Sequence, residues 1–287
     1  MAKKQKDIAT SIEKIAEFHS PIYSPIEDRE EILHVASTNG YVYNLKDSEV
    51  SSVYNTSGQP TGLAFDVEAG SYIADIAHQA ILSQGLTGSK AEKFEVIKDY
   101  EGMPLLGPNS LIINKDGNSL FFTDSGPFGH TTTANPRGSV YTVDLESCII
   151  KPLIYELLAY PCGLALSPDE SALYVAEMCK NRVLRLIQYP AGIFHSSTFY
   201  QFSGRLGPIS LAMHYRNYLF VARYDFPECS KDGVITVISE KGELITEIII
   251  PGVPEITGLQ FAASNGDILY VTEKTHNSLY KLSINIK

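Results

Sequence analysis

Charged side chains recur at one place in a repeating pattern of short apolar runs. Each stands near the end of a run such as SYIADI, LFFTDS or LYVAEM. The set consists of Asp75, Asp124, Glu177, Arg223 and Glu273. If these positions converge, Asp124 and Glu177 are candidate catalytic acids or bases, and Arg223 could anchor an anionic ligand or pair with one of them. Because buried charges must be paired, the expected role of the set is structural, in the turns of the fold.

A second series of candidate residues belongs to a repeated phrase that starts with proline. The copies are PTGLAF, PNSLII, PCGLAL and PISLAM, with PEITGLQF as a longer version. The side chains at equivalent positions are Thr61, Asn109, Cys162, Ile209 and Thr257. Asn109 offers an amide oxygen to a hard cation, and Cys162 offers a thiol to zinc or to a nucleophilic mechanism. A buried cysteine that packs as a small hydrophobe is the simpler interpretation of Cys162.

His130 is the third candidate, in the insertion GPFGHTTTANPRG at residues 126–138. This is the longest segment between two strand-like runs, so it could cover a pocket. Histidine titrates nearest to neutral pH, which makes His130 a candidate acid–base or contact residue. A solitary histidine on a loop is more often a solvated surface residue, and that alternative stays open.

The elements that would position these residues are strands. Helical periodicity is nearly absent after residue 18, and runs rich in β-branched and aromatic residues alternate with Gly, Pro, Asn and Asp turns, as in all-β folds. The phrase leucines Leu63, Leu111, Leu164, Leu211 and Leu259 are 47 to 53 residues apart. Each phrase is followed by two or three further strand-like runs. A repeat of about 40–50 residues with four strands predicts a six-bladed β-propeller with four antiparallel strands per blade.

Closure of the ring follows from the ends of the chain. The last unit supplies three strands before Lys287, whereas SIEKIAEF at residues 11–18 is a spare strand-like segment. We therefore expect the N-terminal strand, about residues 11–18, to complete the last blade and leave no open edge. The chain is predicted to be one domain, 1–287, with inner strands starting near residues 20, 61, 109, 162, 209 and 257.

The wording of these repeats resembles a known group of propellers. The segments GPNSLIINKDGNSLFFTDSG and PCGLALSPDESALYVAEMCKNRVLRL are similar to the strictosidine-synthase-like propellers and to the gluconolactonases, senescence-marker proteins and luciferin-regenerating enzymes. The resemblance extends over the chain in blade order and is strongest from about Leu106 to Leu186. It implies a six-bladed propeller, but it specifies function less closely because one fold hosts several chemistries.

In the lactonase branch, the resemblance implies a divalent ion, usually calcium, on the propeller axis. It implies ligands from the inner strands, where a Glu, two Asn and an Asp would be found. Asn109 matches one of these, while Cys162, Ile209 and His19 stand at the other three, and the remaining axial positions are Thr61 and Thr257. A ring without a carboxylate should hold calcium poorly. A zinc site of His19, Cys162 and Asn109, or a thiol nucleophile at Cys162 with His19 as its base, is the weaker alternative.

The plant synthase branch implies a catalytic glutamate on the inner strand of the last blade. At that place this sequence has Thr257 and Gly258, and neither Glu255 nor Glu273 matches cleanly. Synthase chemistry is therefore not supported.

Composition limits the partners that can be expected. The 287 residues carry a net charge of −10, which argues against nucleic-acid binding. No apolar run is long enough for a membrane span or a secretory signal, and four irregularly spaced cysteines indicate free thiols, so a cytoplasmic protein is expected.

Two functional hypotheses follow. In the first, the propeller has largely lost its axial metal site, needs no cofactor and serves as a binding or scaffold protein, with a protein partner or a small molecule at the axis. In the second, it is a metal-dependent hydrolase of lactones or esters that keeps Asn109 as a ligand of calcium or another divalent ion and recruits Asp124, Glu177 or His130. We favour the first, and whether the protein is an enzyme stays open at this point.

Overall fold

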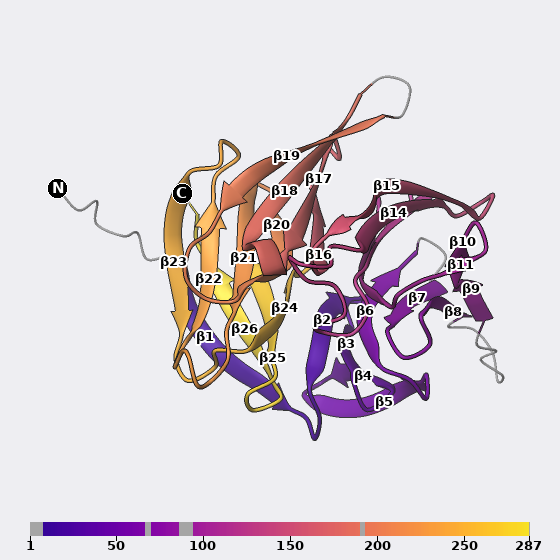
Figure 1. The fold of residues 1–287 in the computed structure, drawn as a ribbon. Helices are drawn as coiled ribbons and strands as arrows, with labels where there is room; N and C mark the ends of the chain where they lie inside the picture. The colour runs from indigo at the N-terminus through magenta and orange to yellow at the C-terminus, as the bar shows by residue number, and fades with distance from the viewer. Residues whose placement is uncertain (1–7, 67–69, 86–93, 190–192, 287) are drawn as a thin grey trace.

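Six antiparallel sheets of four strands each follow one another around a central axis (Figure 1). The computed structural model describes residues 8–66, 70–85, 94–189 and 193–286. We number the blades in chain order, beginning with the blade that contains β2. In each blade the first strand is the edge strand nearest the axis, and the fourth strand is the outer edge strand.

The strand bounds show the regularity of the repeat. Blade one contains β2 (Ile22–Glu27), β3 (Leu33–Ser37), β4 (Tyr41–Lys46) and β5 (Glu49–Asn55). Blade two contains β6 (Pro60–Phe65), β7 (Gly70–Asp75), β8 (Ala80–Gly85) and β9 (Phe94–Ile97), followed by a small hairpin of β10 (Asp99–Tyr100) and β11 (Met103–Pro104). Blade three contains β12 (Pro108–Ile113), β13 (Ser119–Asp124), β14 (Gly138–Asp144) and β15 (Ile149–Leu158).

The second half of the chain repeats this plan. Blade four contains β16 (Pro161–Leu166), β17 (Ala172–Glu177), β18 (Arg182–Gln188) and β19 (Phe194–Gln201), with a 3₁₀ turn at Met178–Lys180. Blade five contains β20 (Gly207–His214), β21 (Tyr218–Tyr224), β22 (Gly233–Ile238) and β23 (Leu244–Ile250). Blade six contains β24 (Ile256–Phe261), β25 (Ile268–Glu273), β26 (Ser278–Ile284) and the N-terminal strand β1 (Ala9–Glu17).

Blade six joins the two ends of the chain. Strand β1 pairs antiparallel with β26, from Ala9 opposite Ile284 to Glu17 opposite Ser278. The edge of β26 is therefore covered, which removes a template for unwanted strand pairing. The prediction of a six-bladed propeller closed by its N-terminal segment is confirmed.

The inner strands form the hub of the molecule. Strands β2, β6, β12, β16, β20 and β24 each contact the next, and β24 contacts β2 again, so the ring is closed. Each middle strand lies between two neighbouring sheets and is buried on both faces, so all six residues of β17 and of β22 are buried. Apolar side chains fill the space between the sheets. This packing fixes the inner strands around the axis.

A β-bulge near the start of every inner strand decides what faces that axis. The pairing register shifts once in each, for example between Pro60 and Gly62 and between Ile256 and Gly258. The same irregularity occurs in the other four blades. A bulge leaves one residue unpaired and re-aims its side chain. Six bulges at one level therefore create a ring of side chains that no longer alternate as in a regular strand.

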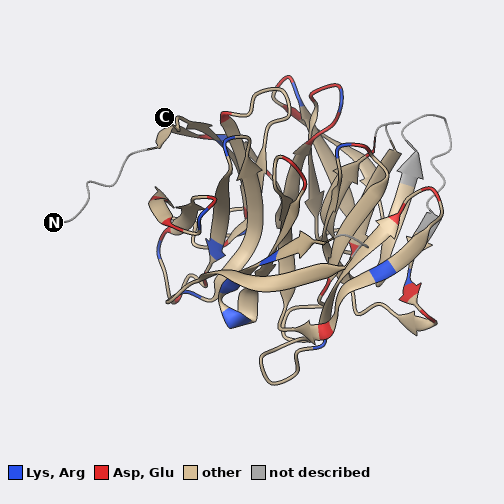
Figure 2. Cartoon of the chain, turned by 90° about the horizontal axis from the view of Figure 1, so that it is seen from above, with Lys and Arg blue, Asp and Glu red and all other residues tan. Residues whose placement is uncertain are grey.

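Charged side chains lie mainly on loops and strand ends, and both signs are spread around the molecule (Figure 2). Within the described parts of the chain, no helix is long and apolar enough to cross a membrane.

Candidate functional site

The axial ring is defined by the register of the first two strands of each blade. Pro60 pairs with Asp75, Pro108 with Asp124 and Pro161 with Glu177. In blade one, Ile22 pairs with Ser37 in the same way. The residue after each of these positions lies at the bulge; in blade one this is Tyr23, which pairs with Ala36 just before the register shift. From blade one to blade six, the ring is Tyr23, Thr61, Asn109, Cys162, Ile209 and Thr257.

Tyr23 thus occupies the position for which His19 was expected. His19 is exposed and lies in a bend before β2. The segment HSPIYSP contains two Ser-Pro phrases, HSP and YSP, and the second one lies at the bulge. The two phrases look alike in sequence, and only the strand register separates them. The pairing of His19 with Cys162 as a nucleophile or zinc site is therefore not formed.

The even blades, meaning blades two, four and six, use their ring side chains to bind the neighbouring blade. Thr61 Oγ1 donates to the carbonyl oxygen of Asn109 at 2.9 Å. Thr257 Oγ1 donates to the carbonyl of Ile22, and Cys162 Sγ lies 3.3 Å from that of Pro208. In each case the acceptor belongs to the inner strand of the next blade.

Cys162 is a structural residue in this arrangement. Its side chain is completely buried, and the carbonyl of Ala176, 3.6 Å from Sγ, is an alternative acceptor for its single S–H. Burial raises the pKa of the thiol to about 12. The neutral thiol is neither a metal ligand nor a nucleophile, both of which require the thiolate. Cys162 therefore makes the same kind of contact to the next blade as Thr61 and Thr257 make in blades two and six.

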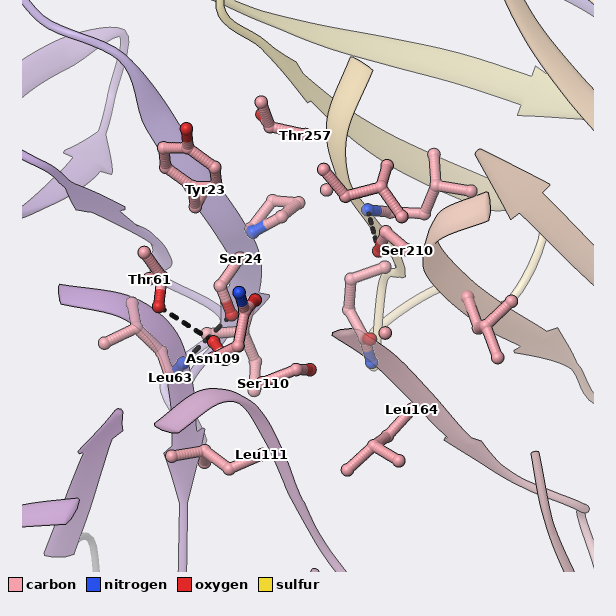
Figure 3. A pocket seen from close by; sticks show the side chains of 18 of the residues that line it. Tyr23, Ser24, Thr61, Leu63, Asn109, Ser110, Leu111, Leu164, Ser210 and Thr257 are labelled. Carbon is pink, nitrogen blue, oxygen red and sulfur yellow. Dashed lines mark hydrogen bonds between the residues drawn. The ribbon is translucent and has the colours of Figure 1, made fainter. Parts of the chain in front are cut away.

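The next inner-strand position alternates between serine and glycine. The odd blades, meaning blades one, three and five, have Ser24, Ser110 and Ser210, whereas the even blades have Gly62, Gly163 and Gly258. Ser24 Oγ accepts a hydrogen bond from Leu63 N, and Ser210 Oγ accepts one from Leu259 N, each at 2.9 Å (Figure 3). Glycine allows the close approach at the other type of interface, where Thr61, Cys162 and Thr257 donate to the next blade: a Cβ at Gly163 would lie 2.6 Å from Ser210 Cα.

The odd blades contribute the ring side chains that are not used in this way: Tyr23, Asn109 and Ile209. Asn109 Nδ2 donates to Ser125 Oγ and to Tyr160 OH, each at 3.3 Å. Tyr23, Asn109 and Ile209 all line the axial cavity, and Tyr23 and Asn109 are seen at its wall in Figure 3. Thr61 and Thr257 also line the cavity, but their hydroxyls donate to neighbouring strands. The ring therefore has three side chains that donate to the backbone of the next blade and three, Tyr23, Asn109 and Ile209, that face the cavity without such a bond among the described residues.

The cavity runs along the axis and has a volume of about 460 Å³. One part of its wall is apolar and comes from the repeated leucines and neighbouring residues of the inner strands: Leu63, Leu111, Leu164, Leu211, Leu259, Phe65 and Ile113. The other part, near the ring, contains Tyr23, Tyr160 and Tyr224 together with Asn109. Further polar side chains, including Gln59, Ser110 and Gln260, also line the wall. Concave sites of this size that combine apolar surface with polar groups are typical of small-molecule binding.

A cluster of the buried residues Tyr224 and Glu255 with the partly exposed Lys274 forms one side of the ring end of the cavity. Tyr224 OH donates to Glu255 Oε1 at 2.6 Å, and Lys274 Nζ lies 2.9 Å from both of these oxygens. Burial, followed by the hydrogen bond to Glu255, raises the pKa of Tyr224, so its hydroxyl stays protonated. Neither Lys274 nor Tyr224 was predicted as a site residue, although each directly follows a residue of the charged series, Glu273 and Arg223.

The acidic members of that charged series hold loops. Asp124 accepts hydrogen bonds from Leu106 N at 2.9 Å and Gly107 N at 2.7 Å. Burial raises the pKa of Asp124 to about 6, although these two donors oppose the shift. Glu177 is fully buried and accepts from Ala159 N at 2.8 Å and Arg182 Nε at 2.6 Å. Neither carboxylate lines the axial cavity.

The two remaining acids act in the same way. Asp75 Oδ1 accepts from the backbone N–H groups of Gln59, Ala77 and His78. Glu273 accepts from His276 N and Ser278 N. The structural role expected for these carboxylates is what their contacts show.

Arg223 also turns away from the axis. Its guanidinium donates to the carbonyls of Ser203 and Gly204 at 2.7 and 2.9 Å, stacks over Phe202 at 4.7 Å and lies 3.5 Å from a carboxylate oxygen of Glu247. These partners belong to the connection between blades four and five and to an outer strand, so Arg223 is neither in the ring nor in the cavity wall.

His130 is exposed and does not line the axial cavity. Its loop does reach the cavity through Phe128, whose ring lies 5.3 Å from Tyr160 and 6.2 Å from Phe226. The aromatic residues of the loops, rather than the histidine, are thus the groups placed over the ring.

The ring residues do not fit a calcium ion. Ca²⁺ takes six to eight oxygen ligands, with carboxylates supplying most of the charge. Here Asn109 supplies the one amide oxygen, Ile209 supplies none, and the hydroxyls of Thr61 and Thr257 are tied to neighbouring strands. The nearby carboxylate of Glu255 already binds Lys274. Among the residues that the structure describes, no group of three or more His, Cys, Asp or Glu side chains is placed to hold a metal.

Comparison with known proteins identifies the family. The model of the SMP-30/gluconolactonase/LRE-like region matches residues 20–275. The chain belongs to the SMP-30/gluconolactonase/LRE-like family. The resemblance read from the blade phrases is therefore confirmed, and the axial cavity lies where the inner strands of this propeller family member meet.

Relatives of this family member include bacterial lactonases. Lactonase drp35 of Staphylococcus haemolyticus is 29% identical over 200 residues, which cover 67% of this chain and 58% of the relative. Lactonase drp35 of Staphylococcus saprophyticus is 35% identical over 137 residues, or 46% of this chain and 39% of the relative. The matches thus span about two fifths to three fifths of the length of these relatives.

Solved structures support the same fold. A gluconolactonase from Xanthomonas campestris has a TM-score of 0.79 at 20% identity, covering 96% of this chain and 91% of its own. The calcium-binding protein regucalcin from Agrobacterium tumefaciens has a TM-score of 0.78 at 15% identity, covering 96% and 94%. At such identities the likeness shows the propeller architecture alone.

Proposed function

We propose that this propeller is a binding protein for small, largely apolar molecules in its axial cavity, and that calcium-dependent lactone hydrolysis is lost or greatly weakened. The observation that carries the proposal is the division of the ring. Thr61, Cys162 and Thr257 donate hydrogen bonds to backbone carbonyls of neighbouring blades, and the ring contains no carboxylate. Such a hub holds the blades around an open cavity and offers few oxygen ligands to a cation.

The wall of the cavity supports the same function. Its apolar part would provide most of the binding free energy through burial, at about 25 cal/mol per Å² of apolar surface. The tyrosine hydroxyls and Asn109 would orient the ligand, as a small number of polar groups does in most binding sites.

Metal analysis combined with a substrate panel tests the proposal. Protein purified with and without added calcium is assayed by elemental analysis and with a panel of aliphatic lactones and aryl esters. We expect less than stoichiometric calcium and no turnover that depends on it. Stoichiometric calcium together with calcium-dependent turnover would contradict the proposal.

A second candidate function is hydrolysis of lactones or esters. It is favoured by the relatives named lactonases and by Asn109, which faces the cavity with its amide nitrogen fixed by Ser125 and Tyr160. If this function holds, Asn109→Ala abolishes turnover while the control variant Lys281→Met, on β26 and outside the cavity wall, retains it. Equal loss in both variants, or no turnover in the unchanged protein, would remove this candidate.

A further inference from the structure

The charge of the cavity wall indicates the class of ligand. The chain has a net charge of −10, and its charged side chains lie mainly on loops and strand ends (Figure 2). Of the described residues that line the axial cavity, Lys274 is the one with a charged side chain. An acidic protein therefore presents a single positive group to whatever enters its axis.

Lys274 is held at the ring end of the cavity by two groups that lie behind or beside it. Its ammonium binds Glu255 Oε1 and Tyr224 OH, and it lies over the Tyr224 ring at 5.4 Å from the centroid. An ammonium has three N–H donors. Among the described residues these two contacts use two of them, so one donor is available for a ligand.

Glu255 offsets much of the ammonium's charge, but a ligand inside the cavity contacts the ammonium and not the carboxylate. It is buried and is not among the lining residues, whereas Lys274 and Tyr224 are. The carboxylate thus sits behind the ammonium and fixes its position. A ligand meets the ammonium, the hydroxyl of Tyr224 and, in the neighbouring part of the wall, Tyr23.

The rest of the wall specifies what must accompany the negative group. Leucines from five inner strands line the cavity beyond the ring. Burying a charged or strongly polar group against them would be costly without a partner. The ligand therefore needs one anionic end and a hydrocarbon or aromatic body.

We infer that the axial cavity binds an apolar carboxylate, with its carboxylate on Lys274 and its apolar part among the inner-strand leucines. This inference rests on the proposed binding function and specifies the ligand class for the same site. The ligand's carboxylate accepts a hydrogen bond from the third N–H of Lys274, and no covalent step is involved.

Matched probes with the same apolar chain test the ligand class. Octanoate and octan-1-ol are titrated into the full chain by calorimetry at pH 7, where the acid is ionised. We expect octanoate to bind about tenfold more tightly or better, because a hydrogen bond to a charged group is stronger than one between neutral groups. Equal affinities, or tighter binding of the alcohol, would overturn the inference while leaving the proposed function in place. Failure of both probes to bind would contradict the proposed function itself.

Variants assign the preference to Lys274. Lys274→Met leaves Glu255 buried without its partner and could unfold the protein, so the double variant Lys274→Met/Glu255→Gln, which removes both charges, is made beside it. We expect the double variant to bind octanoate no better than octan-1-ol, while the control Lys281→Met, on β26 and outside the cavity wall, keeps the preference. A preference that survives in the folded double variant would overturn the assignment.

Discussion

The odd and even blades of this propeller share one backbone plan but use it differently at the hub. In the even blades, the ring residue is small and donates to the next blade, and glycine follows it. In the odd blades, the ring residue is Tyr23, Asn109 or Ile209, and a serine follows it. The comparison shows that half of the ring is structural. Where an even-blade residue such as Cys162 replaces an expected metal ligand, its role is to join two blades. Where an odd-blade residue such as Ile209 does so, it changes the cavity wall that a ligand would contact.

The largest expected effect is on the close contact between an even and an odd blade. Gly163→Ala places a Cβ 2.6 Å from Ser210 Cα and 2.8 Å from the carbonyl oxygen of Ile209. Because backbone on both sides must move, we expect the free energy of unfolding to fall by about 3 kcal/mol. The measurement is urea denaturation. Ser110→Ala, at the equivalent position of an odd blade, is the control, and a loss as large as that in Gly163→Ala would contradict the division of roles.

The second test replaces the thiol. Cys162→Thr copies the residue of blades two and six and is expected to cost less than about 1 kcal/mol, since a hydroxyl can donate to the carbonyl of Pro208. Cys162→Asn buries a larger amide in a fully enclosed place and should cost about 2 kcal/mol or more. Thermal and urea unfolding of the two variants side by side provide the measurement. If asparagine is tolerated as well as threonine, Cys162 is not the interblade contact that the structure indicates.

The third test introduces carboxylates. Tyr23→Glu/Ile209→Asp adds two acids beside Asn109 in the odd blades, and we expect it to bind calcium with a Kd of roughly 0.1–1 mM. At ten times Kd this stabilises the protein by about 1.4 kcal/mol. Calorimetry and calcium-dependent melting measure it. Thr61→Glu, which puts one acid into an even blade, should show no calcium-dependent stabilisation, and stabilisation there alone would reverse the assignment.

The smallest effects separate stability from binding. Thr61→Val removes the hydroxyl that donates to Asn109 O and should cost about 1 kcal/mol of stability, with little change in octanoate affinity. Tyr23→Phe removes a hydroxyl at the cavity wall, so we expect a smaller loss of stability and a few-fold weaker binding. Denaturation and calorimetry on both variants check the contrast. If the same variant has the larger effect on both stability and octanoate affinity, the separation of the two roles is wrong.

The sequence by itself determined the architecture of this protein. The five proline phrases and their leucines, 47 to 53 residues apart, fix six blades because each repeat can bury its apolar face only against its neighbours. The missing last strand and the spare segment near Ile12 fixed the closure, since an unpaired edge is unfavourable. Five of the six ring positions could also be found, because they follow one phrase.

Tertiary structure alone decided what those positions do. His19 and Tyr23 precede similar Ser-Pro phrases, and the pairing of Ile22 with Ser37 is what selects Tyr23. Lys274 follows the second strand of blade six directly, and it meets Glu255 and Tyr224 beside the cavity. These contacts join residues far apart in the chain, and no local pattern encodes them. Whether a polar side chain turns to a neighbouring backbone or to a ligand depends on distances of a few tenths of an ångström, which only the packed blades set.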